Sequence, residues 1–379
     1  MLYENNHIFY NENGSTVHFF HTETDGLCIK ADAGVQTLLQ DAYPDFDLCQ
    51  CGGALHIACQ NMDGDLLYLK YINEKWHKYT LLVSKVKGAY DKHFFLLPAG
   101  NCVQLFYTLR SGGKLLLVQQ ILGEGAQPQP AVVAPIHDGE RPFYAVTSQN
   151  FDTDLYYQNE LGVLGYKTYK WSSKSLGNFE PVFSSGTGMP YASLDSFGRQ
   201  HICCVGKKEI LYRQRGLDGT FSPEVRIPLS FAGNPPAPYL RFEEEKIYII
   251  WRQDRSILYA TSVNDGESFC APVRLLSSAS NSVLFTLHQG FERTSALGYF
   301  LNGEIKFYPI AAPKPSAPVQ QPARPQKQPS TQEKPAQSGT AKELERLKRA
   351  VSTLGRELSE LKNRVELVVS MLESKPPQS

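Results

Sequence analysis

The stretch Ser256–Leu276, SILYATSVNDGESFCAPVRLL, shows the plan on which most of this chain is built. Its first part is rich in β-branched and aromatic side chains, which favours a strand. Asn264, Asp265 and Gly266 then predict a tight turn, because Asn and Asp bond to nearby backbone and Gly accepts a positive φ. Pro272 suits the start of an outer strand, since proline has no N–H to donate to a central ladder.

The same kind of strand recurs along the first 310 residues. Its copies start at Leu27, Leu67, Leu116, Tyr166, Ile210, Ile257 and Ile305, which lie 40 to 50 residues apart. A second short apolar run precedes each copy, and turn-forming pairs such as Asp63-Gly64 and Asn302-Gly303 separate many of these runs. A period of this length with several strands per unit is typical of a β-propeller.

The turn itself carries a family resemblance. The pattern Ser262-x-Asn264-x-Gly266-x-Ser268-Phe269 resembles the Asp-box of sialidase-like β-propellers, with Asn in place of the usual Asp and Phe in place of Trp. In that family the box is a structural turn between the two outer strands of a blade. The resemblance therefore implies that these five residues shape the body and do not form a ligand site.

We predict an all-β propeller over residues 1–310, with seven four-stranded blades and six blades as the alternative count. The last blade lacks an outermost strand after Ile310. Leu2–Glu4 are predicted to supply that strand and close the ring, and a three-stranded last blade is the other interpretation.

The composition changes at Ala311. Residues 311–339 contain seven prolines and few apolar side chains, which predicts a disordered, extended linker. Its P-x-x-P patterns are expected in any proline-rich spacer.

A helix is predicted over residues 340–374, because Thr340 and Glu343 form a capping box and Pro376 follows the last turn. Its apolar residues step by three and four without interruption, as in a coiled coil. The predicted oligomerisation seam is Leu344, Leu347, Val351, Leu354, Leu358, Leu361, Val365, Val368 and Leu372. A dimer or a trimer satisfies this seam, and packing of the helix on the propeller is the alternative.

The overall composition argues against several classes of partner. The formal net charge is zero, so no global field attracts nucleic acid or a membrane surface. The beginning of the sequence does not resemble a signal peptide, and no apolar run reaches membrane-spanning length. The eight scattered cysteines do not form a disulfide framework. We expect a cytoplasmic protein with no nucleic-acid or membrane partner.

The sequence predicts no catalytic, cofactor or metal site. The sialidase-like resemblance suggests glycoside hydrolysis as an activity, and Arg226-Ile227-Pro228 resembles the Arg-Ile-Pro signature of that family. This tripeptide falls on an expected outer strand, however, and not at the central pocket. Tyr144, Tyr239, Arg241 and Arg252 are placed on inner strands and form only a loose set of candidates.

Candidate metal ligands are equally scattered. Cys49, Cys51, His56 and Cys59 have suitable side chains, yet strand alternation sends them to different faces. His18, His56 and His201 fall at similar positions on the second strands and are interpreted as repeat-equivalent residues.

The leading functional hypothesis is a non-catalytic binding or scaffold protein. It presents the propeller on an oligomerising stalk, which consists of the linker 311–339 and the helix 340–374. The propeller partner is an unknown protein or glycan. The alternatives are a sialidase-like hydrolase and a carbohydrate-binding lectin, each using the central funnel.

The stalk hypothesis predicts the effect of two substitutions. Replacing Leu358 and Leu361 by Lys places charges in the seam, so the full chain becomes monomeric while its β-sheet circular dichroism is unchanged. Light scattering after size exclusion measures the mass. A wild-type chain that is already monomeric contradicts the hypothesis.

Overall fold

The computed structural model describes residues 6–308, except 11–15, 124–128, 149, 185–187, 230–236, 244, 254–255, 277–281, 290–291 and 302–303. All of the regular secondary structure in these residues is β-strand. The described residues belong to one compact unit, Met1–Lys314. The predicted closing strand Leu2–Glu4, the linker and the coiled-coil helix lie outside the described residues and stay predictions.

The strands form consecutive antiparallel units. The first three units are β1 (His7–Tyr10), β2 (Thr16–Thr22), β3 (Gly26–Ala31) and β4 (Gly34–Leu39); β5 (Ala42–Cys51), β6 (Ala54–Asn61), β7 (Leu66–Ile72) and β8 (Lys75–Leu82); and β9 (Phe95–Ala99), β10 (Cys102–Ser111), β11 (Lys114–Leu122) and β12 (Ala131–Ile136).

The next units follow the same order from an inner to an outer strand. They are β13 (Phe143–Thr147), β14 (Thr153–Gln158), β15 (Leu164–Lys170), β16 (Ser175–Leu176) and β17 (Glu180–Pro181); β18 (Gly188–Leu194), β19 (Gln200–Val205), β20 (Glu209–Arg215) and β21 (Val225–Pro228); and β22 (Tyr239–Glu243), β23 (Lys246–Gln253), β24 (Ser256–Ser262) and β25 (Val273–Leu276). The last unit has three described strands, β26 (Val283–Gln289), β27 (Glu292–Leu301) and β28 (Glu304–Phe307).

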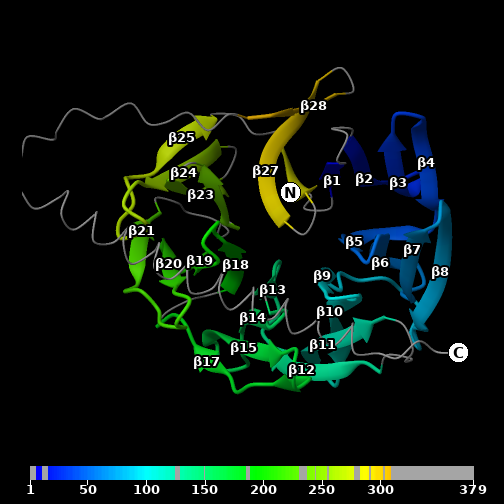
Figure 1. Ribbon diagram of the computed structural model, residues 1–379, viewed down its shortest axis with the longest axis horizontal. Helices are drawn as coiled ribbons and strands as arrows, with labels where there is room; N and C mark the ends of the chain where they lie inside the picture. Colours follow the sequence, from blue (N-terminus) through cyan, green and yellow to red (C-terminus); the bar gives the residue numbers. More distant parts are fainter. Residues whose placement is uncertain are drawn as a thin grey trace, which may run out of the picture. The chain divides into compact units, whose positions relative to one another are not determined.

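Neighbouring units contact one another around a ring. Strand β5 contacts β3 and β9, β9 contacts β13, β13 contacts β18, β18 contacts β22, and β22 contacts β27. The circuit closes where β1 pairs in parallel with β26, which joins the first and last units into one sheet. Figure 1 shows the sheets arranged around this circuit. The prediction of an all-β propeller is therefore confirmed, and we call each unit a blade, numbered from the N-terminus.

The recurring strand in the sequence is the third strand of every blade. Each of its seven copies coincides with β3, β7, β11, β15, β20, β24 or β28.

Burial falls from the inside of a blade to its outer edge. All residues of β14 and β19 are buried, whereas most of β4 and β8 is exposed. Strands that are buried on both faces, such as β14 and β19, carry continuous apolar runs, so the sequence predicts their positions.

An ion pair between a partly exposed arginine and a buried carboxylate joins the last blade to the second across the ring. Arg293 of β27 donates from Nη1 to Asp47 Oδ2 at 2.7 Å, and the Leu96 amide of β9 donates to the same oxygen at 2.7 Å. The Arg293 guanidinium also lies 4.2 Å from the centroid of the Phe95 ring. One arginine therefore ties the last blade to the second and third.

Loss of this arginine should weaken the whole propeller. Arg293→Met leaves the Asp47 carboxylate buried without its cation, so the free energy of unfolding should fall by about 3 to 5 kcal/mol. Urea denaturation followed by tryptophan fluorescence measures the change.

The matched control is Lys87→Ala, because Lys87 pairs with Asp63 at 3.1 Å on the surface. Exposed pairs contribute about 0 to 1 kcal/mol. Equal effects of the two substitutions would contradict a closing role for Arg293.

Candidate functional site

The centre of the ring is occupied by side chains from several inner strands. The rings of Tyr144 and Tyr191 are tilted at 37° to each other with centroids 4.5 Å apart, and the Tyr239 ring lies 6.5 Å from Tyr191. The Tyr191 hydroxyl is 2.9 Å from Ser295 Oγ. Together with Asp47 and Arg293, these rings fill the inner wall of the propeller. The cavity beside Arg293 has a volume of only about 20 Å³, which holds a water molecule and not a sugar.

The loose hydrolase candidates do not form a catalytic group in the described residues. Burial raises the pKa of Tyr144 and of Tyr239, so neither phenol is poised as a nucleophile. Arg241 is on an inner strand, as predicted, but its Nη2 pairs with Glu243 at 2.5 Å. Arg252 is on the second strand β23 and not on an inner strand, which corrects the prediction.

The candidate metal ligands have other roles. His56 uses both ring nitrogens, Nδ1 with the Tyr68 hydroxyl at 2.5 Å and Nε2 with the Cys51 carbonyl oxygen at 3.0 Å. Burial raises the pKa of Cys49 well above its usual range and that of Cys59 to about 12, so both thiols stay protonated. No cluster of three or more potential ligands occurs among the described residues, and no helix there is long and apolar enough to span a membrane.

The turn formed by residues 262–269 packs between the fifth and sixth blades. Gly266 N donates to Ser262 Oγ at 2.9 Å, and Ser268 N donates to Asn264 Oδ1 at 3.2 Å. Gly266 has φ of 84°, and a Cβ placed there would lie 2.3 Å from the Tyr212 hydroxyl oxygen. Only glycine satisfies both constraints. These contacts describe a blade-building turn, although its membership of the Asp-box family stays a prediction.

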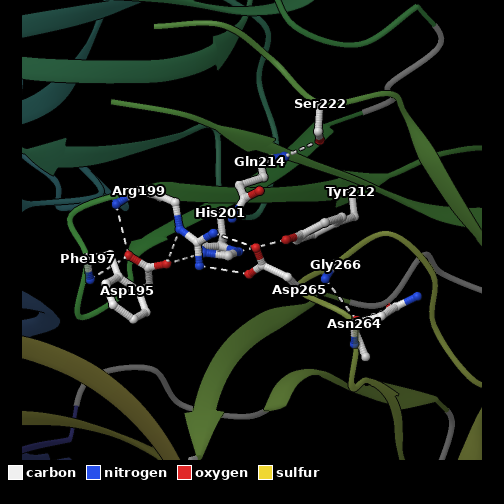
Figure 2. A network of polar contacts seen from close by, with 11 residues as sticks. Asp195, Phe197, Arg199, His201, Tyr212, Gln214, Ser222, Asn264, Asp265 and Gly266 are labelled. Carbon is white, nitrogen blue, oxygen red and sulfur yellow. Dashed lines mark hydrogen bonds and ion pairs between the residues drawn. The ribbon is translucent and has the colours of Figure 1, made fainter. Parts of the chain in front are cut away.

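A polar network holds this turn in place (Figure 2). Arg199 of the fifth blade donates from both Nη atoms to Asp265, at 2.5 and 2.7 Å, and its Nε donates to Asp195 at 2.7 Å. His201 lies 3.2 Å from the same Asp195 carboxylate and 2.7 Å from the Tyr212 hydroxyl. Each strong acceptor is used within the protein, so the network connects two blades and is not a ligand site.

The three histidines of the second strands are not equivalent, which corrects their interpretation. His56 and His201 lie on faces that pack against the following blade, beside Tyr68 and Tyr212 respectively. His18 is shifted by one residue, because Phe19 takes the inward place against the second blade. A shift of one residue reverses the face of a strand. His18 therefore faces the last blade, with its ring 5.9 Å from both Phe285 and Phe300.

His18 lines a pocket of about 600 Å³ between the first and last blades. We call this space the junction pocket. The first blade contributes Ile8, Tyr10, Thr16, His18, Phe20, Lys30, Ala31, Asp32 and Val35, and the last blade contributes Phe300, Glu304, Ile305 and Phe307. The volume lies within the range of small-molecule sites, which are mostly apolar with a few polar groups.

The chemistry of the junction pocket combines aromatic surface with hydrogen-bonding groups. His18 and Phe20 stack at 4.7 Å, and Phe300 is exposed to an extent of 49% although it is a large apolar ring. Burial, followed by the nearby Lys30 charge, lowers the pKa of His18 to about 4, so its imidazole is neutral at pH 7. Its Nε2 lies 3.1 Å from Asn6 Oδ1. Lys30, Asp32 and Glu304 add charged groups at the same pocket.

Sequence reasoning missed this pocket. Its two walls are nearly 300 residues apart in the chain, and they meet only because β1 pairs with β26. The one local signal is that Thr16, His18 and Lys30 interrupt a strand face on which other blades carry apolar residues.

Comparisons with known proteins identify no family for the chain. No protein-family model matches the sequence, and no curated protein matches it. Among solved structures, an ulvan lyase of polysaccharide lyase family 25 has a TM-score of 0.48 and 11% identity, over 81% of this chain and 94% of that one.

Two other solved structures are also similar to this chain. A mutant of the protein AofleA from Arthrobotrys oligospora has a TM-score of 0.44 and 13% identity, over 72% of this chain and 87% of that one. The lectin of Aleuria aurantia, described as a six-bladed β-propeller that recognises fucose, has a TM-score of 0.43 and 11% identity, over 72% and 96%. Similarities at this level do not assign a ligand, and the propeller assignment rests on the strand pairing above.

The turn between the fifth and sixth blades gives a testable expectation. Asn264→Ala removes the acceptor of the Ser268 amide and the contact of Asn264 with Ser262 Oγ at 2.9 Å. The free energy of unfolding should fall by about 1 kcal/mol, while ligand binding at the junction pocket is unchanged. Chemical denaturation measures the first quantity and titration calorimetry the second.

Val263→Ser is the control, since this neighbouring side chain is 74% exposed and should change stability by about 0.5 kcal/mol or less. A loss of ligand binding on Asn264→Ala would assign the turn a functional role.

Proposed function

We propose that the propeller is a non-catalytic carbohydrate-binding module and that the junction pocket holds the sugar. The observation that carries this proposal is the pocket itself, a space of about 600 Å³ that presents aromatic rings and charged side chains together. It favours the lectin alternative over a scaffold for a protein partner, and it moves the site from the central funnel to the space between two blades.

The pocket matches the two kinds of surface on a sugar. A pyranose ring has an apolar face of C–H groups and an edge of hydroxyl groups. Aromatic side chains supply large flat apolar contacts, for which Tyr10, Phe20 and Phe300 are placed on the pocket walls. Lys30 is a donor and Asp32 and Glu304 are acceptors for hydroxyl groups. Glu304 is already oriented by an ion pair with Lys306 at 2.7 Å.

The predicted seven-bladed body and the predicted stalk complete the proposal. A helix that self-associates through the seam from Leu344 to Leu372 would bring two or three pockets onto one particle. A shallow sugar site binds weakly by itself, and linked sites raise the effective local concentration for a repeated glycan. The long proline-rich linker would let each propeller reach a separate sugar.

The proposal predicts which aromatic residues control binding. Binding is first located on a glycan array, and the strongest monosaccharide is then titrated by calorimetry. Phe300→Ala and Phe20→Ala should each weaken binding about tenfold, because truncation of an aromatic anchor at the centre of a binding site costs on the order of 1 to 2 kcal/mol and 1.4 kcal/mol is tenfold in Kd.

Phe197→Ala is the matched control, because Phe197 is an exposed ring, at 71%, that does not line the pocket. Saturable binding that survives both pocket substitutions would place the site elsewhere. Absence of binding to every glycan on the array would overturn the function, and release of shortened sugar products would favour the hydrolase.

A further inference from the structure

Two buried histidines meet where the ring closes. His7 of β1 and His288 of β26 approach with Nδ1 and Nε2 3.0 Å apart, and their rings stack with centroids 5.3 Å apart. The pair lies within the short parallel ladder that joins the first and last blades, which runs from His7 opposite Thr286 to Phe9 opposite His288. His7 is 2% exposed and His288 is 4% exposed. Neither ring can exchange its partner for water without separation of the strands.

One carboxylate faces the pair, that of Asp47, and it is shared with Arg293. One N–H joins a donor of one ring to an acceptor of the other, and when both rings are protonated two N–H groups face each other and this hydrogen bond is lost. The Asp47 carboxylate lies 3.7 Å from His7 Nδ1, but it is already neutralised by Arg293 at 2.7 Å. The other titratable and charged groups that act on this cluster are His18, Cys49, Tyr144 and Tyr191. These four groups are a neutral imidazole of low pKa, a thiol and two phenols whose pKa values burial raises, and none offers a second anion at neutral pH.

We propose that the His7–His288 pair is an acid-sensitive latch, which holds the first and last blades together at neutral pH and releases them, and with them the junction pocket, on acidification. The latch itself rests on the geometry of the pair, while its effect on ligand release rests on the proposed function.

The latch and the pocket share the same strands. Ile8 and Tyr10, which line the pocket, belong to the same four-residue strand β1 as His7. Phe300 of the opposite wall belongs to β27, the strand that also carries Arg293. Asn6 O accepts the Thr286 amide at 2.8 Å and Asn6 Oδ1 contacts His18 Nε2 at 3.1 Å. Separation of β1 from β26 therefore moves one wall of the pocket away from the other.

The sign of the pH dependence follows from proton linkage. Burial and the Arg293 charge lower the pKa of both histidines well below 6.5 in the closed ring. In an open junction each imidazole would titrate near its ordinary pKa of about 6.5. Acid therefore favours the open form, which binds more protons. One histidine raises the open-to-closed ratio about 30-fold between pH 7.5 and pH 5, and two raise it about 1,000-fold.

Hydrogen exchange measures the latch without any ligand. The full-length protein is labelled at pH 7.5, 6 and 5, and peptides covering β1 and β26 are compared between the wild type and His288→Gln. Glutamine keeps a hydrogen-bonding group beside His7 and does not titrate, and comparison at equal pH cancels the intrinsic exchange rate. At pH 5 the wild-type junction should exchange about 30-fold faster than the variant, with little difference at pH 7.5. Peptides from β19 in the fifth blade should not differ.

Controls keep the test decisive. His56→Gln removes another buried histidine, one that contacts Tyr68 away from the junction, and should leave the junction exchange as in the wild type. If His288→Gln does not fold by circular dichroism, His7→Gln replaces it. If neither variant folds, the wild type alone is compared after correction for intrinsic rates, and β1 must lose protection relative to β19 as the pH falls.

Equal protection of β1 and β19 at every pH, or equal exchange of the wild type and the folded variant at pH 5, overturns the latch. The second arm titrates the sugar selected by the glycan array at pH 7.5 and pH 5. Weaker binding at pH 5 in the wild type, with binding retained in His288→Gln, supports release of ligand. A latch seen by exchange in a protein that binds no glycan would refute the carbohydrate function and leave the latch standing. Glycan binding with pH-independent exchange would refute the latch and leave the function standing.

Discussion

The structure depends on the closure of a ring by strands from its two ends. An open series of antiparallel blades would leave one face of the first blade and one face of the last exposed. The parallel pairing of β1 with β26 brings these faces together, and the Arg293–Asp47 ion pair fastens the last blade across the ring to the second and third. Closure of the ring therefore depends partly on polar groups, and the charges of Asp47 and Arg293 contribute to it.

The interface between the last and first blades differs from the interfaces between the other neighbouring blades. Elsewhere, apolar clusters lie between neighbouring blades, such as the one formed by Phe19, Phe46, Leu48 and Ile57 between the first and second blades. Between the last blade and the first, the one-residue shift at His18 places polar residues on the contact face and leaves a pocket. The same departure from the repeat that loosens the packing creates the candidate ligand site.

Several polar clusters that attract attention in the sequence are structural in the described residues. The network of Asp195, Arg199 and Asp265 uses its donors and acceptors to attach a turn of the sixth blade to the fifth. His56 and His201 are each satisfied by a tyrosine of the neighbouring strand. Polar residues thus stabilise contacts between blades in the Arg199 network and between strands of one blade in the two histidine–tyrosine pairs. His7, His18 and His288 instead lie where the ring closes.

The amino-acid sequence by itself determined the local elements of the propeller. The recurring strand, the turn at Asn264–Gly266 and the outer strand after Pro272 were all predictable, because strand propensity, turn chemistry and the missing N–H of proline act over a few residues. The tertiary structure decided everything that joins distant residues. The partnership of His7 with His288 and of Asp47 with Arg293, and the meeting of Tyr10 with Phe300 at one pocket, depend on bringing together the two ends of a 300-residue ring. The repeat period of the sequence does not show which blades contact each other, so the candidate site could be located only in the closed ring.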